Sequence, residues 1–321
     1  AWDEGASSLD DAAQLVLLFG STDVLRNRDL LQDVRSRYPK ALLFGGSTAG
    51  EICDTRVRDD SLAVTAIHFE HTQLRLAQET IGDMQESRAI GERLARALGQ
   101  AQLSHVLVLS DGLKVNGSEL ARGLRENLPQ GVAVTGGLAG DGARFQHTLV
   151  CADGAPQEGQ IAALGFYGER LKIGYGSLGG WDTFGPERLI TRSQDNVLYE
   201  LDGKSALELY KRYLGEHAAE LPASALLFPL ALRIEGENEA VVRTILGVNE
   251  AAQSMTFAGD MPEGAYARLM KANFDRLIDG AASAARAGFE TLGGAAPDLA
   301  LLISCVGRKL VLKQRIEEEV E

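Results

Sequence analysis

The sequence has few cysteines, a deficit of positive charge and no long apolar run. Its three cysteines, Cys53, Cys151 and Cys305, are widely spaced and form no CxxC pair, which favours a reducing compartment and argues against a structural zinc site. No apolar run approaches the roughly 20 residues that a membrane-spanning helix needs, and no secretory leader opens the chain. We therefore predict a cytosolic protein without a membrane span.

Positive charge is scarce. Lys and Arg total 32 against 45 Asp and Glu, which gives a formal net charge of −13. An excess of negative charge repels phosphate backbones and anionic membrane surfaces. We therefore expect neither nucleic acid nor a membrane as a partner.

The motifs of nucleotide-binding proteins and of common hydrolases are also missing. No GxxxxGK[ST] P-loop occurs, and GYGSLG at 174–179 is followed by GWDTFGPER where a dinucleotide motif requires a helix. GxSxG, HExxH and paired-carboxylate signatures are absent as well. A hydrolase is the alternative, but no motif fixes its candidate residues within reach of one another. These candidates are Ser47, Thr48, Ser110, Asp111, His147 and Cys305. We predict that the protein is not an enzyme.

Two segments, residues 15–52 and 105–142, share one pattern. Each reads as an apolar strand, a small-residue turn, a helix, a second apolar strand and a glycine-rich loop. This order is typical of a β-α-β unit, which builds parallel sheets. A third copy is predicted to begin with a strand at 299, and the sequence ends before its second strand.

The fold class that follows is α/β, with repeated β-α-β units in mixed, largely parallel sheets and strand-rich insertions. The segment 61–77 alternates as paired strands do, and 84–99 has the periodicity of an amphipathic helix. The glycine-rich and aromatic segment 161–200 is strand-like. Residues 202–214 predict a turn and a short helix with Ser205 as its N-cap.

Four loops follow the predicted strands of the two units: GSTDV, GGSTAGEI, SDGLKVNG and GGLAGDG. Functional loops of such sheets lie at the carboxyl ends of the strands, so we expect all four at one rim. GGLAGDG is predicted to lead directly into a strand that carries Phe145, His147 and Leu149 on one face.

Six motifs occur along the chain in a characteristic order: GGSTAGEI, GGLAGDGARFQHTLV, LYELDGKSALELYKRYLG, LPASALLFPLAL, VVRTILGV with FAGDMPEGA, and PDLALLISCVGRK. In this combination the sequence resembles FIST-domain proteins over nearly its whole length. The resemblance implies a FIST N-terminal region at 1–198 and a FIST C-terminal region at 199–321. It also implies a further strand with a GFYSYGEI-like loop, so we expect the second region to be truncated at Glu321.

FIST proteins are sensory input modules of signalling systems. The resemblance therefore implies a bacterial ligand-binding sensor, and one branch of the family binds haem and senses nitric oxide. For this chain it implies haem b as cofactor and nitric oxide as gaseous ligand. The implied partner is a sensor histidine kinase or a cyclic-di-GMP enzyme, that is, a diguanylate cyclase or phosphodiesterase. A homodimer is the remaining partner prediction.

Haem iron needs an axial ligand, most often histidine. Five histidines are candidates: His68, His71, His105, His147 and His217. We rank His147 first because Phe145 and Leu149 would give it an apolar surround. The predicted site comprises His147 as iron ligand with Phe145, Arg144, Gly140, Asp141, Gly46 and Ser47. Thiolate or phenolate ligands are the alternatives, from Cys53, Cys151, Tyr167 or Tyr175, although these residues are more typical of a core.

A small amino acid is the alternative ligand. Backbone N–H groups of GGSTAGEI and GGLAGDG, together with Arg144, would hold its carboxylate, and Asp111, Asp141 or Glu51 would hold its ammonium. A further interpretation is that Asp141 and Glu51 only satisfy the amides of their own loops.

Overall fold

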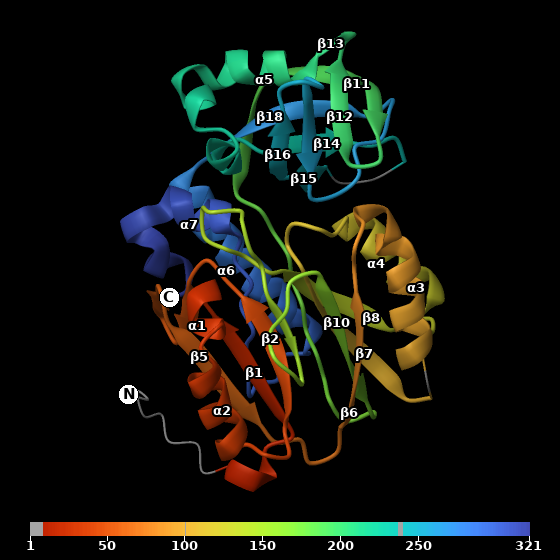
Figure 1. Ribbon diagram of the computed structural model, residues 1–321, viewed down its shortest axis with the longest axis vertical. Coiled ribbons are helices and arrows are strands. Elements are labelled where there is room, and N and C mark those ends of the chain that lie inside the picture. The colour runs from red at the N-terminus through yellow and green to blue at the C-terminus, as the bar shows by residue number, and fades with distance from the viewer. Residues whose placement is uncertain (1–8, 100, 237–239) are drawn as a thin grey trace. The chain divides into compact units, whose positions relative to one another are not determined.

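A computed structural model describes residues 9–99, 101–236 and 240–321 (Figure 1). By its contacts the described chain divides into two compact units. Unit 1 contains the described residues up to Lys114 together with Gly123–Gly142 and Gln146–Ile173. Unit 2 contains Val115–Arg122, Ala143–Phe145 and Gly174–Glu321. Within the described residues, no helix has the length and apolar character that crossing a membrane requires.

Unit 1 contains ten strands among the described residues. They are β1 (Leu15–Gly20), β2 (Leu42–Ser47), β3 (Glu51–Cys53), β4 (Arg56–Arg58), β5 (Leu62–Ile67), β6 (Gln73–Thr80), β7 (Leu103–Ser110), β8 (Ala133–Leu138), β9 (Val150–Ala152) and β10 (Gln160–Tyr167). Its helices are η1 (Asp10–Ala12), α1 (Thr22–Leu25), α2 (Arg28–Arg37), η2 (Met84–Glu86) and α3 (Ser87–Leu98). Helix α4 (Gly117–Asn127) begins in unit 2 and ends in unit 1.

Both predicted β-α-β units form, and the α/β class is confirmed. β1 pairs in parallel with β2, and β7 pairs in parallel with β8. The β1 sheet has the order β5-β1-β2-β9, and the β7 sheet has the order β6-β10-β7-β8. Parallel pairing within the described residues is confined to these two pairs. The sheets are mixed because the inserted strands β5, β6, β9 and β10 add antiparallel neighbours.

The main core of unit 1 lies between its two sheets. Leu15, Leu17 and Phe44 of the β1 sheet pack there with Leu107 and Leu164 of the β7 sheet. Burying apolar surface of this kind is the main force that stabilises a fold. The sheets therefore pack face to face. This packing brings together the loops that follow β2 and β8.

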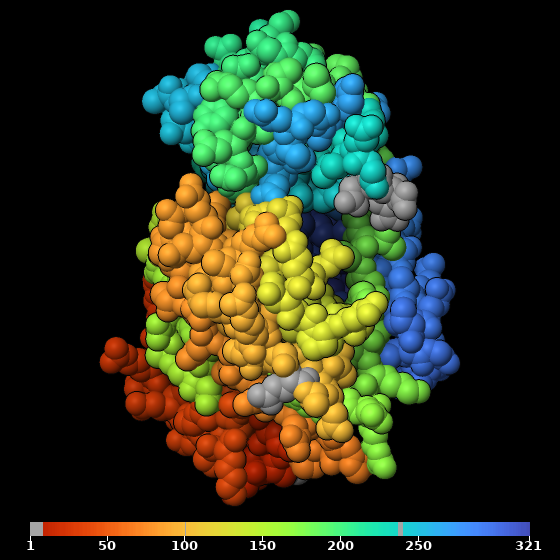
Figure 2. All heavy atoms as spheres, turned by 90° about the vertical axis from the view of Figure 1, so that its right-hand side faces the viewer, coloured from red at the N-terminus to blue at the C-terminus, as the bar shows by residue number. Residues whose placement is uncertain are grey.

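Helices cover the outer faces of both sheets in unit 1. Val34 of α2 packs on the outer side of the β1 sheet with Val16 and Leu18. The predicted amphipathic helix at 84–99 is present as η2 and α3. Helix α3 and the end of α4 lie together on one outer face (Figure 2), where Arg88 donates to Glu126 at 2.6 Å.

The two strands predicted within 61–77 do form, but they do not pair with each other. β5 pairs with β1, and β6 pairs with β10 in the other sheet. Alternation of apolar and polar residues indicates a strand with one buried face, but it does not identify the neighbouring strand.

His105 is a buried histidine on β7, and it makes the stability of the fold depend on pH. Its side chain is 4% exposed, and its Nε2 lies 2.8 Å from Thr135 Oγ1. Burial lowers its pKa from 6.5 to about 4. The unfolded chain therefore binds the proton more readily, and stability that is complete above pH 6.5 is lost as the pH falls toward 4.

We expect wild type to lose about 1–2 kcal/mol more than His105→Gln between pH 7 and pH 5. Urea unfolding followed by circular dichroism at the two pH values measures the difference. His68→Gln is the control because His68 is exposed, and it should follow wild type. Equal pH dependence of wild type and His105→Gln would contradict the assignment.

Unit 2 contains eight further strands and most of the remaining helices. Its strands are β11 (Trp181–Gln194), β12 (Val197–Leu201), β13 (Lys204–Ser205), β14 (Leu230–Arg233), β15 (Val241–Arg243), β16 (Ile245–Asn249), β17 (Ser254–Phe257) and β18 (Tyr266–Ala272). Its helices are α5 (Ala206–Leu214), η3 (Gly215–Glu220), η4 (Ala223–Leu227), α6 (Phe274–Thr291), α7 (Val306–Leu312) and η5 (Lys313–Glu319).

One antiparallel sheet forms most of unit 2. Its order is β15-β14-β18-β11-β12-β17-β16, with β13 on β12. The edges β15 and β16 follow each other in the chain, separated by Thr244, so one short segment supplies both ends of the sheet. Tyr210 of α5 and Phe257 lie in the core. The predicted cap is confirmed, because Ser205 Oγ accepts the Glu208 N–H at 3.2 Å.

The predicted third repeat is wrong. Residues 299–305 form no strand, and α7 begins directly after its N-cap, Cys305. Leu299 and Ile303 are about half exposed. The apolar pattern predicted a strand, but a strand needs a hydrogen-bonded neighbour, and no described strand pairs with this segment.

The strand-like segment 161–200 is interrupted. β10 ends at Tyr167 and β11 begins at Trp181, so GYGSLG at 174–179 lies outside any strand. A Cβ on Gly176 would be 2.0 Å from the Ala284 carbonyl oxygen of α6. The glycines allow this segment to approach the helix backbone closely.

Candidate functional site

The four loops that follow β1, β2, β7 and β8 gather at one end of unit 1, as predicted. The Thr48 N–H donates to Gly20 O at 3.0 Å, which joins the first two loops. The Gly140 N–H donates to Ser47 O at 2.7 Å, and the Ala139 N–H donates to Ser110 O at 2.8 Å. These bonds join the loop after β8 to the ends of β2 and β7. We call residues 20–24, 47–51, 110–114 and 138–142 the loop rim.

Glu51 is buried in the first glycine-rich loop. Its carboxylate accepts the Thr48 hydroxyl at 2.7 Å and the Ser61 N–H at 3.1 Å. Only 3% of the residue is exposed. Glu51 therefore fixes its own loop.

Asp141 plays the same part in the second glycine-rich loop, where it is 4% exposed. One carboxylate oxygen accepts the Thr22 hydroxyl at 2.7 Å. The other accepts the N–H groups of Gln146 and His147 at 3.2 and 3.1 Å. The interpretation that Glu51 and Asp141 satisfy loop donors agrees with this geometry.

Asp111 is 1% exposed and binds three backbone N–H groups. One carboxylate oxygen accepts from Leu113 and Lys114, and the other accepts from Gly159 at 2.8 Å. All carboxylate oxygens of Asp111, Asp141 and Glu51 are therefore engaged within the protein. An incoming ammonium group would have to share them with these donors.

His147 stands beside the loop rim with an exposed imidazole. Its side chain is 47% exposed, and Nδ1 lies 2.8 Å from Glu158 Oε1. Glu158 also contacts Arg26 at 3.1 Å and Lys114 Nζ at 4.0 Å. No bond to Nε2 is found within the described ranges. A carboxylate on Nδ1 fixes the tautomer in which Nε2 carries the free lone pair.

The apolar face predicted beside His147 does not form. Residues 144–149 lie outside any strand, and β9 begins only at Val150. Phe145 has a left-handed φ of 53°, and Leu149 is buried whereas His147 is exposed. Asp141 accepts the backbone N–H groups of Gln146 and His147. These bonds bend the segment 144–149, which was predicted to be an extended strand.

The other predicted site residues fall into two groups. Gly46 and Ser47 are the last residues of β2, and Gly140 lies in the loop after β8. Ser47 Oγ accepts the Leu149 N–H at 2.8 Å, and a Cβ on Gly140 would be 3.3 Å from Ala49 N. Arg144 and Phe145 are grouped with unit 2. The structure therefore brings His147, Asp141, Gly140, Gly46 and Ser47 together within unit 1.

Of the alternative iron ligands, Cys151 and Tyr167 are buried in the core, whereas Tyr175 is exposed. Cys53 is exposed, whereas Cys151 is buried, and burial raises the pKa of its thiol to about 12. The Tyr167 hydroxyl donates to Leu98 O at 2.6 Å. His68 contacts Ala12 O, and the His217 ring lies against the Phe228 ring at a tilt of 43°. In the parts of the chain that the structure describes, no three His, Cys, Asp or Glu side chains gather in a metal-binding geometry.

The sequence did not predict the role of Glu158. It lies 11 residues after His147, and the signal that could have suggested it is an acidic residue directly before Gly159 in the turn that precedes β10. No local pattern links this residue to His147, so the pairing becomes evident only in three dimensions.

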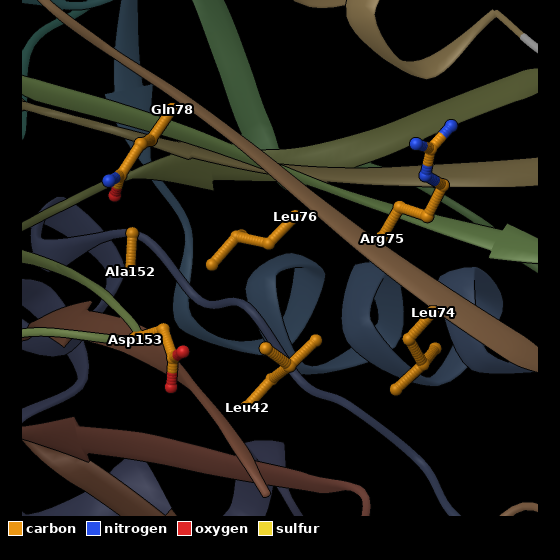
Figure 3. A pocket seen from close by; sticks show the side chains of 7 residues that line it. All are labelled: Leu42, Leu74, Arg75, Leu76, Gln78, Ala152 and Asp153. Atoms are coloured by element: carbon orange, nitrogen blue, oxygen red, sulfur yellow. The ribbon is translucent and has the colours of Figure 1, made fainter.

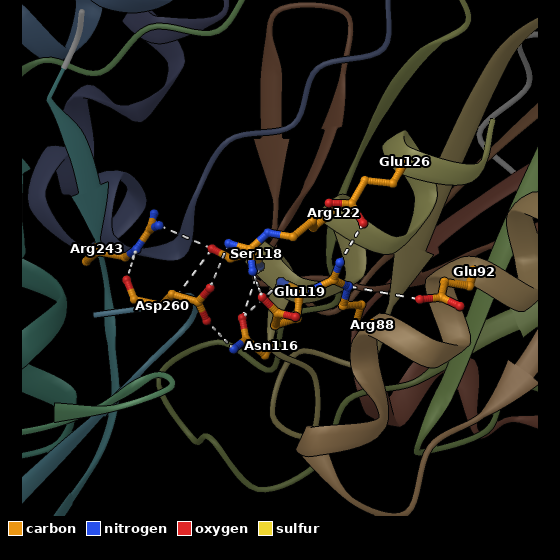
Figure 4. A network of polar contacts seen from close by, with 9 residues as sticks. All are labelled: Arg88, Glu92, Asn116, Ser118, Glu119, Arg122, Glu126, Arg243 and Asp260. Carbon is orange, nitrogen blue, oxygen red and sulfur yellow. Dashed lines mark hydrogen bonds and ion pairs between the residues drawn. The ribbon is translucent and has the colours of Figure 1, made fainter. Parts of the chain in front are cut away.

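A second polar network, also missed from the sequence, lies within unit 2 (Figure 4). Asn116 donates to the Asp260 carboxylate at 2.7 Å, and Arg243 Nε donates to Asp260 O at 2.9 Å. Arg243 also contacts Ser118 Oγ, and Arg122 contacts Asp260 Oδ2. Burial lowers the pKa of Arg243, and the partners around it satisfy the guanidinium.

The fold and the loop rim define an α/β protein whose glycine-rich loops converge at one end of a two-sheet unit. Comparison with protein families identifies it further: the FIST N domain matches residues 14–204, and the FIST C domain matches residues 206–321. The chain belongs to the FIST family. FIST domains are generally sensory ligand-binding domains in signalling proteins. No curated protein matches the chain.

Proposed function

We propose that the chain is a non-enzymatic sensor that holds haem b, with His147 as the axial ligand of the iron. One observation carries this proposal: Glu158 lies 2.8 Å from Nδ1 of an exposed imidazole. Histidines that bind metals commonly donate their other ring N–H to a carboxylate. Bound haem would supply an iron able to take up nitric oxide.

Beside His147 the structure offers a nitrogen donor for the iron and charged neighbours, whereas the apolar face that was predicted there for the porphyrin does not form. Nε2 is directed by the Glu158 contact, and the ring is exposed enough for a ligand to reach it from solvent. Arg26 and Lys114 bring positive charge to the same carboxylate. Such cations bind carboxylates, and the two propionates of haem would share them with Glu158.

The residues behind His147 connect it to the loop rim. The His147 N–H is held by Asp141, and the other Asp141 oxygen holds Thr22 in the loop after β1. A displacement of the imidazole therefore acts on a segment bonded to two loops. A partner histidine kinase, diguanylate cyclase or phosphodiesterase would respond only if its affinity differs between the two states.

Titration of the purified protein with haem tests the proposal. We expect a Soret band that shifts with nitric oxide and is lost in His147→Ala. Glu158→Gln should weaken haem binding about tenfold, because the orienting carboxylate is gone. His71→Ala is the matched control, since His71 is exposed and contacts Arg170 instead.

Two outcomes would count against haem. A wild-type protein without a Soret band would favour the small amino acid as ligand, which a calorimetric screen can test. A His147→Ala spectrum equal to that of wild type would place the iron ligand elsewhere.

A further inference from the structure

A hollow of about 450 Å³ opens within unit 1 between the edge strands of its two sheets. Its lining comes from β6, from β9 and the residue after it, and from the start of β2 (Figure 3): Leu42, Leu74, Arg75, Leu76, Gln78, Ala152 and Asp153. Leu42 is the first residue of β2, and the loop rim begins at the last residue of this strand, Ser47. The hollow and the loop rim therefore lie at opposite ends of β2. The volume is in the range of small-molecule sites.

Apolar side chains form the base of the hollow. Leu74 and Leu76 alternate on one face of β6 and point toward Leu42, whereas the Arg75 guanidinium points to the other side of the strand (Figure 3). All three leucines are only partly buried. An apolar ligand that covered them would gain the free energy of removing their carbon atoms from water.

A buried carboxamide without a full set of partners lies next to the hollow. Gln160 is 7% exposed, and its Nε2 donates to Oε1 of the lining residue Gln78 at 2.8 Å. Gln160 Oε1 is buried and has no hydrogen-bond partner among the described residues. Buried acceptors are nearly always paired, because an unpaired one costs free energy.

The strand register places this carboxamide on the side of the hollow. Gln160, Ala162 and Leu164 alternate on one face of β10, and Ala162 and Leu164 belong to the core between the sheets. Ala162 is opposite Gln78 in the pairing of β10 with β6. Gln160 therefore faces the space between the sheets and lies directly behind Gln78, which lines the hollow, whereas Gln160 itself does not.

We propose that this hollow is a binding site for a small neutral molecule with an apolar body and one N–H or O–H donor. The body covers the leucines, and the donor bonds Gln160 Oε1, which it reaches when the lining side chain of Gln78 turns aside. The lining carboxylate, Asp153, is already paired with Arg35 at 2.6 Å, and the Arg75 guanidinium points to the other side of β6 (Figure 3), so the described lining residues offer a charged ligand no partner. This site does not depend on haem binding at His147.

Indole and 1-methylindole are suitable probes, because they share a flat apolar body and only indole has an N–H donor. Each is titrated into the full chain without added haem, and backbone amide shifts are followed by NMR. We expect indole to shift Leu76 and Ala152 and to bind about tenfold more tightly than 1-methylindole. Equal affinities, or shifts confined to other parts of the chain, would overturn the proposal.

Gln160→Met provides the second test, since methionine keeps the length of the side chain and removes its polar atoms. This variant should bind the two probes equally. Gln73→Met is the matched control, because Gln73 is exposed at the start of β6 and should keep the tenfold preference. A Gln160→Met protein that still prefers indole tenfold would refute the role of Gln160. If this variant does not fold, the comparison of the two probes on wild type decides alone.

Discussion

Replacing Gly45 or Gly136 by alanine is expected to destabilise unit 1 by about 3 kcal/mol or more. An alanine Cβ at Gly45 would be 1.8 Å from Leu18 O, and one at Gly136 would be 1.8 Å from Val108 O. Both obstacles are backbone carbonyls. They cannot move aside without disturbing the parallel pairing of the strands.

The two glycines occupy equivalent positions. Gly45 is opposite Leu18 in the β1–β2 pair, and Gly136 is opposite Val108 in the β7–β8 pair. Each is the first of two consecutive glycines that precede the glycine-rich loop. Gly136 also has a φ of +148°, which adds backbone strain for any other residue. Both substitutions should therefore separate the loops of the rim as well as lower stability.

Urea unfolding followed by far-ultraviolet circular dichroism measures the change in the free energy of unfolding. Gly154→Ala is the control, because the nearest atom to its Cβ would be 3.9 Å away and the residue is exposed. That variant should lie within about 0.5 kcal/mol of wild type. A Gly45→Ala protein as stable as the control would show that β1 and β2 do not approach this closely.

The two β-α-β units could be predicted from the sequence because each contains all its parts. Their apolar strands and glycine-rich loops repeat over nearly the same distance, and parallel strands with a helix between them have few alternative arrangements. The third predicted repeat offered only a first strand, and that strand did not form. The apolar run at 299–303 has the composition of a strand, but a strand is defined by its neighbour, and the pattern contains no information about one.

The candidate site was predictable in position and not in detail. The rule that loops meet at the carboxyl ends of strands placed the four loops together. The conformation after Gly140 depends on where one carboxylate, Asp141, finds its donors. It is therefore set by contacts with Thr22 and His147 that no local pattern encodes, and the orientation of His147 toward Glu158 follows from them.

Unit 2 is expected to lose about 3–5 kcal/mol of stability when Arg308 is replaced by methionine. Arg308 is 7% exposed, its Nε donates to Glu319, and its Nη2 donates to Leu277 O in α6. The Glu319 side chain is 5% exposed. Removing the arginine leaves a buried carboxylate whose remaining described donor is the Ser304 hydroxyl.

The fluorescence of Trp181 can report this change, because Trp181 packs against the cluster of Leu277, Val311 and Leu312 next to Arg308. The double variant Arg308→Met with Glu319→Leu should recover most of the loss, since a matched apolar pair can replace a buried ion pair. Arg315→Met is the control for charge removal, because Arg315 and Glu318 form an exposed pair at 2.7 Å. Exposed pairs contribute about 0–1 kcal/mol. If Arg308→Met were no more costly than Arg315→Met, burial of the Arg308–Glu319 pair would not be what holds α7 and η5 to α6.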